Sequence, residues 1–171
     1  MTMNNNVTKH LAKEAQANGI CTPWLNELKS LDDKDALVDM YIRGIDFCLE
    51  HDYPSNDFIR ENFKGVIEKH GVFLDDTIAL QDQSKCIALG TTKGKVTATG
   101  YSVSEVWVKH DSALNIVAKD NAFVMVDVYD NAVVNVIASD RAKVCVNHHG
   151  GKGIQKATGD AVVKIREKSN K

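Results

Sequence analysis

The pattern of apolar positions changes character near the middle of the chain. Up to about residue 72, apolar residues recur three and four positions apart, as on one face of an α-helix. From about Lys85 onward they alternate with polar residues, as in a half-buried β-strand. This change predicts an α+β protein with a small helical domain at residues 1–75 and a strand-rich domain at residues 76–171.

Three to four short amphipathic helices are expected in the first half. The first spans residues 7–18, and the second begins with Thr22 as its N-cap, followed by a proline at the first helical position. A longer third helix opens with Asp32 and Asp33, whose charges in the first turn complement the helix dipole, and its apolar stripe continues to Leu49. Ser55 caps the next helix. These helices are expected to share one small core.

The second half carries a short repeat. Segments that begin Asp-x-Ala start at Asp111, Asp120, Asp130 and Asp140, which lie 9, 10 and 10 positions apart, and Asp160-Ala161 starts one more copy after an irregular stretch. Each opens a short alternating apolar segment. Ten residues hold one strand of about five or six residues and a corner, because a strand rises about 3.3 Å per residue. The repeat predicts a β-solenoid of stacked coils with a unit of about ten residues.

Two features of this solenoid stay open. Two or three of the units would complete one coil, and the spacing does not choose between them. An antiparallel meander also fits the pattern, because Asp-Asn pairs supply the positive-φ residues of tight hairpins. The equal spacing and the small alanine that follows each turn favour the solenoid, since a small residue suits a crowded interior corner.

Several outward-facing positions of the predicted strands are apolar. Phe123, Met125, Val133 and Ile137 alternate with the inward-facing valines of the same segments. Left bare, they would form a contiguous apolar patch of several hundred Å², which is larger than monomers usually expose. Either the helical half or another copy of the chain must cover it. We expect a homo-oligomer, a dimer or a trimer, built through these four residues.

Charge and composition restrict the classes of partner. The 171 residues include 21 basic and 23 acidic ones, and the formal net charge of −2 argues against non-specific binding to nucleic acid or to anionic membranes. The polar start lacks the pattern of a signal peptide, and no apolar run approaches the roughly 18 residues that span a bilayer. We therefore expect a cytoplasmic protein whose four cysteines are reduced thiols.

Two groups of residues suggest metals, and neither predicts a site. The Asp repeat is similar to the acidic turns of calcium-binding rolls but lacks the glycines whose carbonyls complete the oxygen cage. Each turn Asp is instead expected to bond its own backbone. Cys145, His148 and His149 offer at most three ligands, and adjacent histidines on a strand point to opposite faces. We expect neither a metal nor a cofactor.

The longest break in the repeat is the glycine-rich segment at residues 147–153. Backbone N–H groups around Lys152 would suit an anion, as in phosphate-binding nests, although the spacing is not that of a P-loop. A flexible loop between coils is the simpler interpretation. If a small anionic ligand binds, the expected site consists of His148, His149, Gly150, Gly151 and Lys152.

Five segments of the chain resemble parts of a known group of proteins. They are Ile45–Glu50, Tyr53–Asn56, Phe63–Gly65, Ala122–Val128 and Lys143–Asn147. The group consists of uncharacterised proteins from Bacteroidota genomes that are linked to prophages and mobile elements, and the resemblance covers nearly the whole chain. It implies a helical N-terminal part followed by a β-solenoid, in a mobile-element setting. It implies no activity.

No set of residues predicts catalysis. His110 beside Asp111 would serve as a general base only with a nucleophile nearby, and no nucleophile motif occurs. We expect a non-enzymatic binding protein that acts inside the cell, where it occupies a host protein or sequesters a small signalling molecule. A structural or assembly component of a phage-like particle is the alternative. A polysaccharide-active enzyme is a distant third, because no recognisable pair of carboxylates is present.

Overall fold

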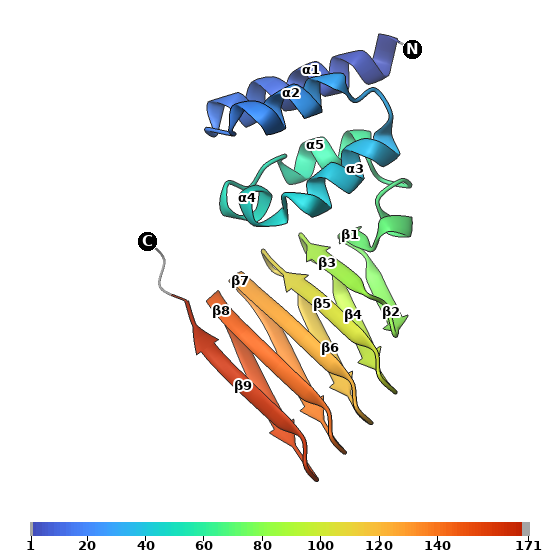
Figure 1. Ribbon diagram of the computed structural model, residues 1–171, viewed down its shortest axis with the longest axis vertical. Coiled ribbons are helices and arrows are strands. Elements are labelled where there is room, and N and C mark those ends of the chain that lie inside the picture. The colour runs from blue at the N-terminus through green and yellow to red at the C-terminus, as the bar shows by residue number, and fades with distance from the viewer. Residues whose placement is uncertain (1, 169–171) are drawn as a thin grey trace. The chain divides into compact units, whose positions relative to one another are not determined.

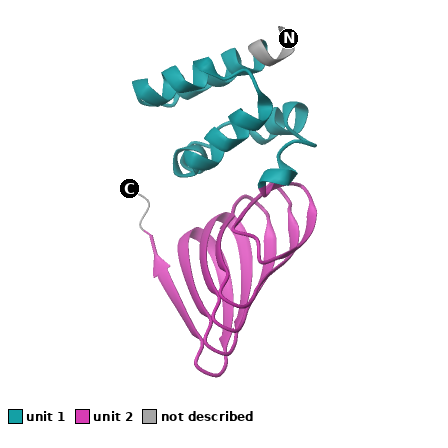
Figure 2. Ribbon diagram, turned by 45° about the vertical axis from the view of Figure 1, so that its right-hand side comes forward, with its two compact units in different colours: residues 1–70 teal, residues 71–171 magenta. Residues whose placement is uncertain are grey.

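The computed structural model describes residues 2–168. The chain divides into two compact units, residues 1–70 and residues 71–171, which Figure 2 shows in different colours. This boundary lies five residues before the predicted one, because the first strand already begins at Val72. Residues 1 and 169–171, which the predicted domains include, lie outside the described residues.

The helical unit contains five α-helices and one 3-10 turn (Figure 1). These are α1 (Thr2–Ala17), α2 (Thr22–Ser30), α3 (Lys34–Arg43), α4 (Ile45–Glu50), α5 (Asn56–Asn62) and η1 (Glu68–His70). The predicted long third helix is divided at Gly44, which is both the C-cap of α3 and the N-cap of α4. Five helices therefore replace the three to four that the apolar stripes predict.

Of the two predicted helix caps, Ser55 forms as expected and Thr22 does not, while Asp33, expected in the first turn of its helix, is its N-cap. The Asp33 carboxylate accepts a hydrogen bond from the Ala36 N–H at 3.0 Å, and the Ser55 hydroxyl accepts one from the Phe58 N–H at 3.2 Å. The Thr22 cap is wrong by one residue, because Cys21 holds the N-cap position of α2 without a side-chain hydrogen bond. Such capping bonds stabilise a helix by about 1 kcal/mol.

The solenoid unit consists of nine strands. These are β1 (Val72–Leu74), β2 (Thr77–Gln81), β3 (Lys85–Leu89), β4 (Lys93–Ala98), β5 (Val103–Val108), β6 (Ala113–Ala118), β7 (Phe123–Ala138), β8 (Lys143–Ala157) and β9 (Val162–Glu167). Every strand pair among the described residues is parallel. The antiparallel meander is therefore wrong, and the chain forms a parallel-strand solenoid of about 5 turns.

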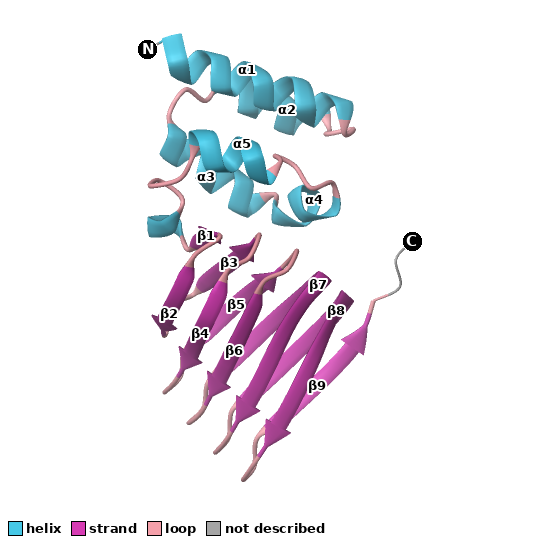
Figure 3. Cartoon of the chain, turned by 180° about the vertical axis from the view of Figure 1, so that it is seen from behind, coloured by secondary structure: helices cyan, strands magenta, loops and turns pink. Residues whose placement is uncertain are grey.

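The register of the strands shows how many strands complete a coil. Val106 pairs with Val126 and Ile116 pairs with Val136, so hydrogen-bonded neighbours lie 20 positions apart in the chain. One coil therefore contains two strand segments, not three. Figure 1 and Figure 3, which view the molecule from opposite sides, show the two layers of strands that result. The sheet path runs β1-β3-β5-β7-β6-β4-β2 and passes from one layer to the other through β7.

The core of the solenoid lies between the two layers. Like residues stack on like residues, as in the row of Val106, Val126 and Val146 and the row of Ala98, Ala118 and Ala138. All six side chains are buried. Fully burying one valine contributes about 1.5–3 kcal/mol, so the inward positions that the alternating pattern predicts supply the main driving force for stacking.

The four apolar residues predicted to form one outward patch lie on different layers. The first half of β7, with Phe123 and Met125, pairs with β5, whereas the second half, with Val133 and Ile137, pairs with β6. The expectation of a contiguous patch is therefore wrong. It fails because the chain turns a corner between the two halves of β7, which the one-dimensional alternation does not reveal.

Candidate functional site

Residues with a positive φ mark the corners of the solenoid. They recur every ten positions from 90 to 150: Gly90, Gly100, His110, Asp120, Asp130, Asp140 and Gly150. Aspartate reaches this region more easily than most side chains, which explains why it recurs in the repeat. Asp111 is not one of these residues, because His110 holds the corner with a φ of 63°. This shift accounts for the spacing of 9 between Asp111 and Asp120.

The corner side chains bind the neighbouring coil. The Asp120 carboxylate accepts a hydrogen bond from the Gly100 N–H at 2.9 Å, and the Asp140 carboxylate accepts one from the Asp120 N–H at 3.1 Å. In the other row of corners, the Nδ1 atom of His110 accepts from the Gly90 N–H at 3.1 Å. The expectation that each turn Asp bonds its own backbone is therefore wrong for these residues. The repeated acid joins successive coils.

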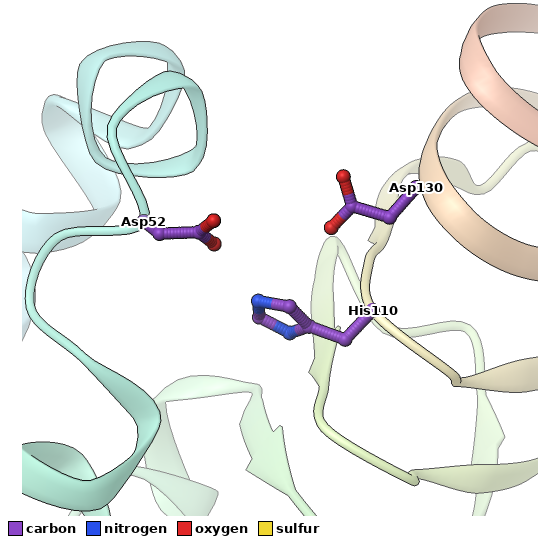
Figure 4. Close-up of side chains that lie close together, drawn as sticks. All are labelled: Asp52, His110 and Asp130. Atoms are coloured by element: carbon purple, nitrogen blue, oxygen red, sulfur yellow. The ribbon is translucent and has the colours of Figure 1, made fainter.

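His110 and Asp130 lie at the same corner on consecutive coils, and Figure 4 draws both side chains. Their ligand atoms lie within 4.8 Å of each other. One oxygen of Asp130 pairs with the Nζ atom of Lys109 at 3.1 Å, and Nδ1 of His110 is occupied by the Gly90 N–H. Asp52, also drawn in Figure 4, belongs to the helical unit. Two ligands from the solenoid do not complete a zinc site, which takes four.

The glycine-rich segment is not a loop. Strand β8 runs without interruption from Lys143 to Ala157 and turns its corner at Gly150 and Gly151. A Cβ atom on Gly151 would lie 2.3 Å from a methyl carbon of Val128, and the residue has a φ of 60°. A glycine is required here because the corner presses against the previous coil, which is a structural reason rather than a ligand-binding one.

The two histidines of the predicted anion site point to opposite sides of the strand. His148 follows the interior row of Val108 and Val128, and its Nδ1 atom lies 3.0 Å from a carboxylate oxygen of Glu167. His149 lies on the outer side. Lys152 lies beyond the corner, exposed, in the other layer. The structure therefore does not gather the five predicted residues around one cavity.

An ordered cluster that sequence reasoning missed lies on the outer side of the layer formed by β5 and the first halves of β7 and β8. The rings of Tyr129 and His149 stack at 4.4 Å with an angle of 5° between their planes. Asp127 lies 2.7 Å from Nε2 of His149, and the Nζ atom of Lys109 lies 5.3 Å from the centre of the Tyr129 ring. Lys109, Tyr129 and His149 occupy equivalent places on successive coils, and Asp127 lies two residues before Tyr129 on the same strand. The spacing of 20 between the first three becomes a signal only when the number of strands per coil is known.

The four cysteines differ in their exposure to solvent. All four are free thiols, of which Cys21 is exposed and the other three are buried. Burial raises the pKa of the Cys48 thiol and of the Cys86 thiol to about 12. Both thiols stay protonated at neutral pH, which makes them packing groups and not nucleophiles.

His110 and Asp111 have different partners in the structure. Nδ1 of His110 accepts a backbone hydrogen bond, while the Asp111 carboxylate meets the side-chain amide of Asn131 at 3.4 Å. These contacts do not place the Asp111 carboxylate so that it orients His110 as a general base, although the two residues are adjacent in the sequence.

No helix among the described residues is long and apolar enough to cross a bilayer. Neither a family model, nor a curated protein, nor a solved structure gives a significant match to the chain.

Proposed function

We propose that the chain is a non-enzymatic binding protein that acts inside the cell and presents its solenoid as a rigid surface to a partner. One observation carries this proposal: large apolar side chains of the solenoid are exposed. Val103 and Phe123, which are register partners on one layer, are 61% and 38% exposed, and Ile137 on the other is 50% exposed. Contiguous exposed apolar side chains mark interaction surfaces, and Val103 and Phe123 are neighbours on adjacent strands.

The resemblance to proteins of prophages and mobile elements supports a setting for this activity. In that setting the protein occupies a host protein or sequesters a small signalling molecule. The same apolar side chains support self-association as a dimer or trimer. We also propose that a unit of about ten residues is the repeat of the solenoid, two units to a coil, because left-handed corner residues recur at that interval.

A structural component of a phage-like particle is the second candidate. Exposed apolar groups on both layers favour this candidate, because a subunit with two apolar faces can contact two neighbours and extend an array. A binding protein needs only one such face.

Affinity purification of the tagged chain from its native host separates the two candidates. A stable host partner that is lost in Phe123→Glu or Ile137→Glu supports the binding function, with Lys95→Glu as a control at an exposed polar position. Incorporation into particles supports the alternative. Measurable turnover that disappears in His110→Ala or His148→Ala would overturn the non-enzymatic proposal.

A further inference from the structure

Strand β9 is an edge strand at the C-terminal end of the described solenoid, and residues 152–157 of β8 form the edge of the other layer. Among the described strands, β9 pairs only with β8. The N–H of Val162 donates to the carbonyl of Ala142 on the previous coil. In a parallel ladder, alternate residues direct both backbone groups to the same neighbour, so the N–H and C=O of Val163, Ile165 and Glu167 face away from β8. Such an edge is a template for an added strand.

Positive charge is concentrated at this end of the solenoid. Residues 141–168 contain seven basic side chains and two acidic ones, whereas residues 71–140 contain five basic and nine acidic ones. The basic ones are Arg141, Lys143, Lys152, Lys156, Lys164, Arg166 and Lys168, all exposed. Within the described chain none of the seven side chains forms an ion pair. Glu167 is engaged by His148, which leaves the positive charge largely uncompensated.

We propose that the open edge of β9 accepts an extended acidic segment of a partner protein as an additional strand. This site is separate from the apolar faces on which the proposed function rests. Lys164 and Arg166 lie on the outer side of β9, in register with Cys145 and Asn147. Acidic residues at alternate positions of the added strand lie opposite these bases, at the 4.5–5.5 Å typical of cross-strand pairs.

The inner side of the same edge selects the residues of the added strand that alternate with its acidic ones. Val163 and Ile165 continue the interior rows of Val144 and Val146, and Ile165 is 38% exposed at the end of its row. Apolar residues of the added strand extend these rows. The site therefore selects a segment in which acidic and apolar residues alternate, which is strand addition with charge and side-chain specificity.

Two other occupants fit the edge less well. A second copy meeting the edge head to head would bring Lys164 and Arg166 of both copies together, and like charges at an interface are strongly unfavourable. A nucleic acid would neutralise the bases but would leave the backbone N–H and C=O groups and the side chain of Ile165 without partners. An acidic peptide strand satisfies the charges, the backbone groups and the apolar ends together.

The test uses the full chain and a dye-labelled peptide of about eight residues that alternates Glu and Val. Fluorescence anisotropy at low salt is expected to show saturable binding. N-methylation of alternate peptide nitrogens, which removes the hydrogen-bond donors, is expected to weaken it at least about tenfold. A Lys-Val peptide is expected not to bind. Equal affinity of the methylated peptide would overturn strand addition.

Matched charge reversals locate the site. The double variant Lys164→Glu with Arg166→Glu is expected to weaken peptide binding about tenfold or more, while Lys93→Glu with Lys95→Glu, at exposed positions in an early coil, is expected to change it less than about twofold. Equal effects of the two pairs, or tighter binding of a DNA duplex than of the peptide, would contradict the proposal.

Phe123→Glu is expected to leave peptide affinity unchanged. Host-partner capture that depends on Phe123 without any peptide binding would leave the proposed function standing and remove this inference alone.

Discussion

The carboxylate of Asp140 accepts a hydrogen bond at 3.1 Å from the backbone N–H of Asp120, the residue that holds the equivalent corner one coil earlier. Asp120 has the same relation to Gly100, at 2.9 Å. A row of corner carboxylates thus links three successive coils. The contacts satisfy backbone N–H groups at the corners and give the repeated Asp its role in the stacking of the solenoid.

Asp120→Ala is expected to lower the free energy of unfolding by about 2–3 kcal/mol, because it removes a hydrogen bond to a charged acceptor and places a Cβ-bearing residue without a polar side chain at a φ of 58°. Asp111→Ala is the matched control. Asp111 belongs to the same Asp-x-Ala pattern but has no positive φ, and a loss below about 0.5 kcal/mol is expected there. Urea unfolding followed by far-UV circular dichroism measures both. Equal losses would refute the role assigned to the corners.

Gly151→Ala is expected to be more damaging than Gly100→Ala. Both glycines have a φ of 60°, so both substitutions carry the strain of the left-handed region, about 1–2 kcal/mol. A Cβ at Gly151 would also lie 2.3 Å from a methyl of Val128, whereas a Cβ at Gly100 meets nothing within 4 Å. The difference between the two unfolding free energies measures the close approach of adjacent coils. A difference near zero would show that the corner has room.

The stability of the solenoid is expected to fall in acid partly through Asp82. Its carboxylate accepts from the Thr99 N–H at 2.7 Å and from the Thr99 hydroxyl, and these bonds lower the pKa of Asp82 below its ordinary value of 3.8. A carboxyl whose pKa is lowered in the folded state stabilises it above the unfolded pKa and loses this contribution as the pH falls through the folded value. Urea midpoints between about pH 2 and 6 are therefore expected to decline less steeply in Asp82→Asn, and an unchanged acid slope would contradict this.

Much of the architecture follows from periodicity, because burial imposes a period of two on strands and of 3.6 on helices. Val106, Val126 and Val136 are buried as their alternation predicts. The number of strands per coil was not predictable, since it depends on where the chain turns and not on which residues face inward. Because the number of strands per coil was unknown, the sequence analysis placed Phe123 and Ile137 on one surface.

The glycine-rich segment shows a second limit of sequence reasoning. Glycines next to a lysine are compatible with an anion-binding loop, but the same residues satisfy a corner that leaves no space for a side chain beside Val128. Only the position of the neighbouring coil distinguishes the two. The Tyr129–His149 stack was missed for the same reason, because the residues are adjacent in space and 20 positions apart in sequence.

Cys21 is expected to react first among the four cysteines of the folded protein. It is the exposed thiol, whereas Cys48 and Cys86 are buried and burial raises the pKa of each to about 12. At pH 8 only about one part in ten thousand of these buried thiols is ionised, and the thiolate is the reactive form. Alkylation with iodoacetamide and peptide mass spectrometry should find Cys21 modified well before the others. Loss of this order in urea provides the control for burial.

Self-association through the solenoid is expected to depend on one layer. Phe123 and Ile137 belong to opposite halves of β7 and to different layers, so a two-fold dimer that buries one of them leaves the other at the surface. Either Phe123→Glu or Ile137→Glu should therefore convert a dimer to a monomer, because an unpaired charge in a buried interface is costly, while the other substitution leaves the mass unchanged. Light scattering of the two variants and the unmodified chain measures this. Dissociation by both substitutions would indicate an assembly that uses both layers, as the particle alternative requires, and a mass near 18.8 kDa for the unmodified chain would exclude self-association under those conditions.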